Sequence, residues 1–239
     1  MTGISFHTEW QDGERVAGEE LSATFASLQI DVGGETLTKV LDNRAATIRD
    51  SIFVPLYPIA EWLVSHWWFL TNESENPAKK STLAFQRRHS LKTNTDGYAL
   101  PDLTMTPSGA QTTLRWTAGS SPWTKSYFLN SGQTTIDTDQ FMEGCADFIE
   151  KVTRRLDARG IRSTFLQDEW TAIQNADDDE SKFCSMSAQL GWDPYDLDES
   201  QQNQIFTIAE RLGGLSGEAF PIINGSAPAA SLCQLEGKD

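Results

Sequence analysis

Three histidines, three cysteines and two acidic clusters are the features of this 239-residue chain whose residue types could do chemistry. His7, His66 and His89 lie far apart, and none has the four-residue spacing of a zinc-binding His-Glu-x-x-His helix. His7-Thr8-Glu9 has the His-x-Glu order of zinc deaminases, but the Pro-Cys-x-x-Cys half of that motif is absent. The sequence therefore predicts no catalytic residue, no metal site and no cofactor site.

The two acidic clusters fit helix starts and turns better than calcium sites. Asp177-Asp178-Asp179-Glu180 precedes an apolar helical repeat, and carboxylates stabilise a helix N-terminus. The cluster from Asp193 to Glu199 lacks the central glycine and the terminal bidentate glutamate of a calcium loop. We interpret both clusters as caps.

The cysteines give no sign of a disulfide framework. Cys145, Cys184 and Cys233 are odd in number and widely spaced. Cys145 and Cys184 fall on apolar faces of predicted helices, so we expect inert thiols in the core.

A net charge of −15 disfavours direct binding to nucleic acid, which requires a basic surface. The turn at Leu190-Gly191-Trp192 precedes an acidic helix, which argues against a DNA-reading helix-turn-helix. Basic residues gather only between Lys79 and Lys92. The N-terminus does not resemble a signal peptide and no apolar stretch is long enough to span a membrane, so a cytoplasmic location is expected.

The longest apolar stretch, Pro55 to Leu70, predicts a buried, tryptophan-rich helix over 56–70. Pro58 suits the first turn of this helix. Trp62, Leu63 and Trp67 are predicted to face inward, and Glu61 and Ser65 outward. Trp68 lies about 100° around the helix from Trp67, so it is a candidate partner contact.

The remaining pattern predicts an α+β fold with segregated strands and helices. The region 1–136 reads as a β-rich domain whose antiparallel hairpins turn at Gly33-Gly34, at Pro107-Ser108-Gly109 and at Ser131-Gly132, with a further strand at 50–54 and a short helix at 83–92. The region 137–215 reads as a helical bundle that opens with a capping box at Asp137–Gln140. Residues 216–239 read as a tail or linker.

One block of residues carries a family resemblance. Arg49-Asp50-Ser51, the run from Tyr57 to Leu63, and Trp67-Trp68 resemble the region that precedes the peptidase domain in bacterial ImmA/IrrE-type metallo-endopeptidases. Further matching pieces follow in the same order: Gly97 to Leu103, the helix from Phe148 to Leu156, and Leu190 to Pro194. The resemblance covers roughly residues 40–215.

Those peptidases bind zinc through His-Glu-x-x-His, which this chain lacks. The resemblance therefore implies a non-catalytic module that recognises a protein partner, in bacterial stress, toxin–antitoxin or phage (antiviral) defence. Two alternatives stay open. One is an acidic inhibitor that mimics nucleic acid and binds a DNA- or RNA-processing protein. The other is an enzyme whose metal site is not recognisable from sequence.

Overall fold

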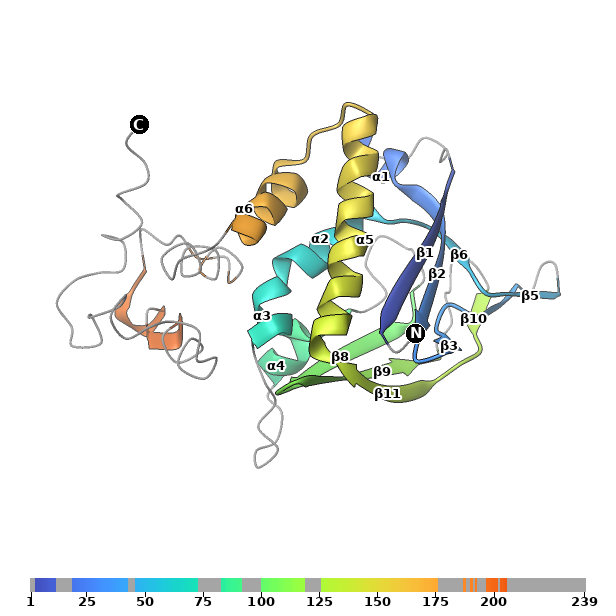
Figure 1. Ribbon diagram of the computed structural model, residues 1–239, viewed down its shortest axis with the longest axis horizontal. Coiled ribbons are helices and arrows are strands. Elements are labelled where there is room, and N and C mark those ends of the chain that lie inside the picture. The colour runs from blue at the N-terminus through green and yellow to red at the C-terminus, as the bar shows by residue number, and fades with distance from the viewer. Residues whose placement is uncertain are drawn as a thin grey trace.

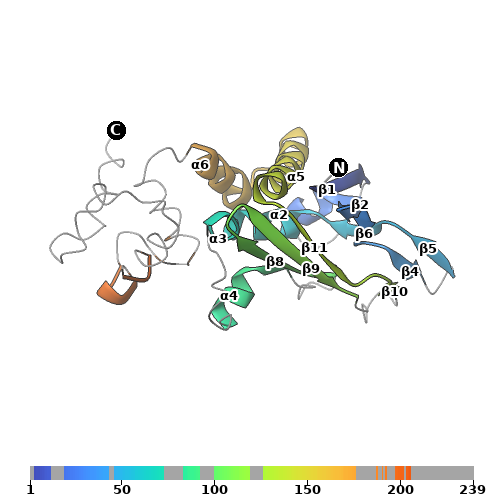
Figure 2. The ribbon, with the colours of Figure 1, turned by 60° about the horizontal axis from the view of Figure 1, so that its bottom comes forward.

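The computed structural model describes residues 3–11, 19–42, 46–72, 83–91, 100–118 and 126–175, with 187, 190, 192, 197–201 and 203–205. These residues form antiparallel sheets and helices, so the fold is α+β, as the sequence predicts. Helix α5 crosses the front of Figure 1, with β1 and β2 on one side and α2, α3 and α6 on the other. In Figure 2, α5 and α6 lie above β8, β9 and β11.

The strands form three sheets. The first contains β1 (Ile4–Trp10), β2 (Phe25–Val32), β3 (Glu35–Thr36) and β6 (Ile52–Pro55). The second has the order β10 (Ser126–Phe128), β4 (Val40–Asp42), β5 (Thr47–Arg49). The third has the order β11 (Gly132–Asp137), β9 (Gln111–Thr117), β8 (Asp102–Ser108), β7 (Ser90–Leu91).

The helices come mainly between and after the strands. They are α1 (Glu19–Ala23), α2 (Tyr57–Ser65), α3 (Trp67–Asn72), α4 (Leu83–Arg88), α5 (Thr138–Ala158), the π-helix η1 (Thr164–Asp168) and α6 (Glu169–Asn175). No helix among the described residues has the length and apolar character needed to cross a membrane.

Two of the three predicted hairpins are present. Gly33 and Gly34 have φ of 58° and 90°, and Val32 pairs with Glu35 across them. Positive φ at both central residues is typical of a type I′ turn, for which glycine is favoured. The second hairpin joins β8 to β9, but it turns at Gly109-Ala110, so Pro107 lies inside β8 opposite Thr112.

The third predicted hairpin, around Ser131-Gly132, is wrong. Strand β10 pairs with β4, and β11 pairs with β9. Gly132 lies opposite Trp116, and a Cβ at this glycine would lie 2.5 Å from Trp116 Cζ2. Gly132 is therefore needed where β11 passes the indole of Trp116, and it does not serve as a turn residue.

The predicted helix 56–70 is two helices, α2 and α3, separated at His66. The backbone of His66 leaves the helical region, with φ −112° and ψ 6°, and its Nδ1 lies 2.8 Å from the carbonyl oxygen of Trp62. The backbone amide of His66 donates to the same carbonyl at 3.1 Å, so both groups of His66 contact the last turn of α2.

The break changes which side chains are buried. Leu63 is buried as predicted, whereas Trp62 and Trp67 are half-buried and pack against the edge of the core. Glu61 and Ser65 are also half-buried, so neither faces solvent fully. The buried side chains of this segment are mainly aliphatic: Ile59, Ala60, Leu63, Val64, Phe69 and Leu70.

Helix α5 begins as the sequence predicts, at a cap in which Asp137 Oδ1 accepts a hydrogen bond from the Gln140 amide at 3.2 Å. It packs against β1 and α2, and its buried side chains belong to the same hydrophobic cluster as those of the strands. Phe148 on α5 contacts Phe6 on β1, with ring centroids 4.5 Å apart. The residues on either side of the predicted boundary at 136/137 thus share one core.

Candidate protein-interaction surface

Helix α3 carries Trp68, the residue that the sequence singles out as a partner contact. Its neighbour Trp67 makes an edge-to-face contact with Trp170 of α6. The two ring centroids are 4.8 Å apart and the ring planes meet at 76°. Trp68, one residue further around the helix, is half-buried. It is therefore neither a core side chain nor a fully exposed one, a position compatible with contact to another protein.

A second surface lies on the β10-β4-β5 sheet, whose β4–β5 end extends away from the helices in Figure 2. The exposed large apolar side chains among the described residues are Ile48, Phe53 and Leu129, at 60%, 49% and 41% exposure. Ile48 lies on β5, Phe53 follows on β6, and the amide of Leu129 donates to Lys39 beside β4. Ile48 is therefore on this sheet, Leu129 directly follows β10, and Phe53 belongs to the first sheet, where β6 pairs with β2.

The pairing register places Ile48 and Leu129 on the same face of that sheet. Ile48 is opposite Leu41, Leu41 is opposite position 127, and Leu129 is two residues beyond 127. Side chains opposite each other in an antiparallel pair, and those two apart along a strand, share a face. Lys39 and Asp50, whose charged groups are 3.8 Å apart, border the same apolar face. Grouped apolar side chains with a polar rim are typical of protein-binding surfaces.

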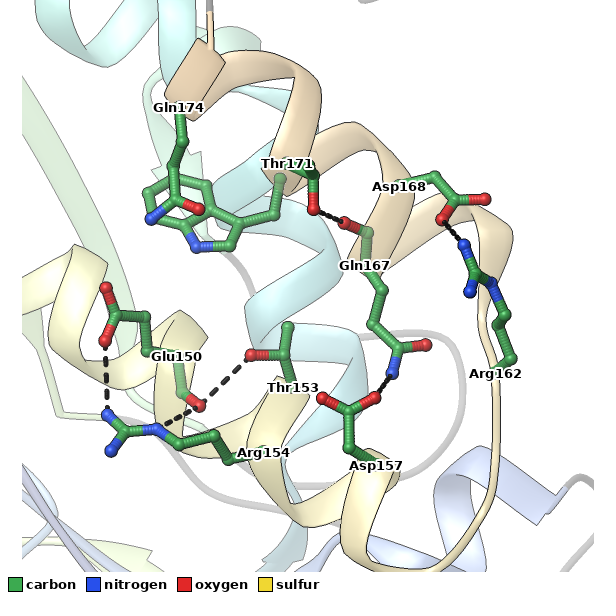
Figure 3. A pocket seen from close by; sticks show the side chains of 10 residues that line it. Glu150, Thr153, Arg154, Asp157, Arg162, Gln167, Asp168, Thr171 and Gln174 are labelled. Carbon is green, nitrogen blue, oxygen red and sulfur yellow. Dashed lines mark hydrogen bonds and ion pairs between the residues drawn. The ribbon is translucent and has the colours of Figure 1, made fainter.

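A polar groove of about 410 Å³ separates α5 from η1 and α6 (Figure 3). On its α5 wall, the Arg154 guanidinium lies 3.2 Å from the Glu150 carboxylate, one turn earlier. The side chain of Thr153 donates to the Glu150 carbonyl at 3.1 Å. These polar side chains of the α5 wall therefore form hydrogen bonds and an ion pair with groups on the same helix.

The opposite wall of the groove is also internally paired. Arg162 Nη2 lies 2.6 Å from Asp168 Oδ1, and Gln167 on η1 donates to the Asp157 carboxylate on α5 (Figure 3). Exposed pairs of this kind contribute only about 0–1 kcal/mol each. The groove therefore fixes η1 against α5 by side-chain bonds and offers no arrangement of nucleophile, base or metal ligands.

Trp170 lines this groove from α6, 5% exposed, with a buried Nε1 that has no hydrogen-bond acceptor in the described part of the chain. The preceding turn, η1, is a π-helix capped by Ser163, whose Oγ accepts from the Leu166 amide. π-Helical turns insert an extra residue and are common at functional positions. Here the turn brings Trp170 against Trp67 and so links α6 to α3.

The three histidines are not brought together. His7 is exposed on β1, 3.2 Å from Asp31; His66 stacks on Trp62; His89 is fully buried after α4. Burial lowers the pKa of His66 below its ordinary value, opposed by its bond to the Trp62 carbonyl. Among the residues that the structure describes, no group of three or more His, Cys, Asp or Glu side chains could hold a metal ion.

Of the other residues that the sequence singles out, Cys145 is fully buried in α5, and burial raises the pKa of its thiol far above the ordinary value. Asp198 and Gln201 form a reciprocal cap, with bonds of 2.9 and 2.8 Å, as expected for a helix start. Asp177–Glu180, the basic residues Lys79, Lys80 and Lys92, and the tail 216–239 lie outside the described residues.

Sequence reasoning did not find the apolar face of the β10-β4-β5 sheet. Positions 40–42 and 126–128 pair across more than eighty residues, and no local pattern signals which strands meet. The π-helix likewise has no signal beyond the serine cap at Ser163.

Comparison of the chain with models of protein families, with curated proteins and with solved structures found no match.

Proposed function

We propose that this chain is a non-catalytic module that recognises a protein partner in an ImmA/IrrE-type zinc peptidase system. We place it in the bacterial cytoplasm, in stress response, toxin–antitoxin control or phage defence. Its partner is the peptidase of that system, whether joined to this chain or separate. The observation on which this depends is the ordered set of residues that resembles the region preceding such peptidases.

The positions of those residues support the proposal. Ile59, Ala60 and Leu63 of the tryptophan block are buried, as are Leu103 and, on α5, Phe148, Ile149, Val152 and Leu156. Asp50 accepts a hydrogen bond from Thr38 at 2.7 Å through its carbonyl, and Ser51 accepts from Ser27 at 2.8 Å. These residues build the core and join the strands, which are the positions that two proteins with the same fold would share. The resemblance therefore supports a shared fold.

The surface supports a role in protein contact. Trp68 and the apolar face with Ile48 and Leu129 offer aromatic and aliphatic anchors of the type that carry binding energy. The net charge of −15 favours association with a basic surface and disfavours self-association. The predicted helical bundle over 137–215 lies partly outside the described residues, and it remains part of the proposal.

Metal analysis tests the non-catalytic part of the proposal. We expect the purified chain, dialysed without chelator, to contain well below one zinc per molecule by inductively coupled plasma mass spectrometry. The physical reason is that zinc requires three or four ligands within about 2.0–2.3 Å, and the sequence lacks a motif that supplies them. A matched sample of an intact ImmA/IrrE-type peptidase, purified in the same way, serves as the positive control. Stoichiometric zinc in this chain would contradict the proposal and favour an enzyme with an unrecognised site.

A further inference from the structure

The side chain of His89 is fully buried between the ends of two helices. Its Nδ1 lies 2.9 Å from the carbonyl oxygen of Phe85 in α4. Its Nε2 lies 3.1 Å from the carbonyl oxygen of Phe69 in α3. Carbonyl oxygens only accept hydrogen bonds, so both contacts are hydrogen bonds only when both ring nitrogens carry hydrogen.

A neutral imidazole has one N–H and one lone pair. In this position, that lone pair would face a carbonyl oxygen without a proton between them, in a site closed to water. We propose that His89 is a proton-dependent clasp: as the imidazolium it donates to both carbonyls and holds α3 to α4, and loss of its proton releases one of the two helices. This inference depends on the geometry at His89 and is independent of the proposed function.

The surroundings offset the cost of burying a cation. Phe69 and Phe85 each lie among the last four residues of their helix, and the Phe85 carbonyl also accepts a hydrogen bond from the His89 amide at 3.1 Å. These helix ends carry partial negative charge, which favours a histidine cation. The Phe85 ring also stacks on the imidazole, with centroids 4.0 Å apart, and a cation is attracted to an aromatic face.

Some ionisable groups around the clasp oppose the positive charge on His89, and others do not compete with it. Arg88 lies over the Phe69 ring at 4.9 Å and opposes a second positive charge nearby. Burial lowers the pKa of His66, which keeps that ring neutral near pH 7 and leaves it without a competing charge. The described titratable or charged side chains on the elements around the clasp are Arg88 on α4, His66 before α3, Tyr57 and Glu61 on α2, Asp102 on β8 and Arg115 on β9.

The sign of the pH dependence follows from proton counting. Because the folded protein holds a proton on His89 that the unfolded chain releases near pH 6.5, stability from the clasp is present on the acid side and is lost as the pH rises. The backbone of His89 also accepts from the Met105 amide at 2.8 Å, so the clasp joins the two helices to the β7–β8 sheet. Its release would loosen α3, which carries Trp68.

Nitrogen NMR of protein labelled with ¹⁵N-histidine tests this directly, because the chain has three histidines. His7→Gln, at an exposed position, and His66→Gln assign the signals. We expect the His89 ring to show hydrogens on both nitrogens at pH 6–7.5, and to lose one at higher pH together with protection of α3 and α4 amides from hydrogen exchange. A single-hydrogen ring throughout pH 5–9 would overturn the proposal.

Thermal melting supplies an independent measurement. Loss of a charge-assisted bond predicts that Tm of the wild-type protein falls by roughly 5 °C more than that of His89→Gln between pH 6 and 9. His7→Gln, the matched control, should keep the wild-type pH dependence. Equal pH dependence in His89→Gln and the wild type would also overturn the clasp.

Discussion

Replacing Phe148 by alanine is expected to destabilise the protein by about 3–5 kcal/mol, a large part of a typical total of about 5–15 kcal/mol. Phe148 is fully buried on α5 and contacts Phe6 on β1. Its removal leaves a cavity where the helix meets the sheet. Urea unfolding followed by circular dichroism measures the loss.

The exposed neighbour Asp147 provides the control, and Asp147→Ala should change stability by less than about 0.5 kcal/mol. Because α5 and the strands share one core, helix and strand signals should be lost in one transition in Phe148→Ala. Two separate transitions, with the strands unfolding as in the wild type, would show that α5 belongs to an independent bundle.

Replacing Gly144 by alanine is expected to destabilise the protein by about 1–3 kcal/mol, although alanine is the better helix former. A Cβ at Gly144 would lie 2.4 Å from the Ile4 carbonyl oxygen and 2.8 Å from Ile4 Cγ2. The nearest atom is backbone of β1, which is paired along its length with β2 and cannot move aside easily. The helix would therefore be pushed away from the sheet.

The sign of this change makes the measurement decisive. At an open helix position, Gly→Ala gains about 1 kcal/mol. Glu143→Ala, on the exposed side of the same turn, serves as the control and should leave the unfolding midpoint almost unchanged. A stabilised Gly144→Ala protein would mean that α5 does not approach β1 as closely as described.

Local sequence signals predicted those parts of the fold that local chemistry determines. The Gly33-Gly34 turn and the Asp137 cap each depend on a few adjacent residues, and both are present. The run of apolar residues from Pro55 to Leu70 located the core, but not the break at His66. At that break the His66 backbone leaves the helical region while its imidazole contacts the Trp62 carbonyl, a feature that periodicity does not reveal.

Long-range pairings were beyond the reach of sequence patterns. Ser131-Gly132 has the composition of a turn, yet Gly132 is where β11 passes the Trp116 indole. The apolar face with Ile48 and Leu129 also depends on a distant strand pairing, between β4 and β10. Trp68 is half-buried on α3, and its role as a partner contact stays a prediction.

Binding to the peptidase tests the proposed function most directly. Isothermal titration calorimetry would measure the purified chain against an ImmA/IrrE-type peptidase from the organism that encodes it. Trp68→Ala and Ile48→Ala would be compared with the wild type after circular dichroism shows that both are folded. We expect one-to-one binding with Kd of about 1 μM or tighter. If the peptidase binds at Trp68, Trp68→Ala should weaken binding at least about tenfold; if it binds at the apolar face of the β10-β4-β5 sheet, Ile48→Ala should do so. No binding at about 100 μM, or identical binding in both variants, would contradict partner recognition through these surfaces.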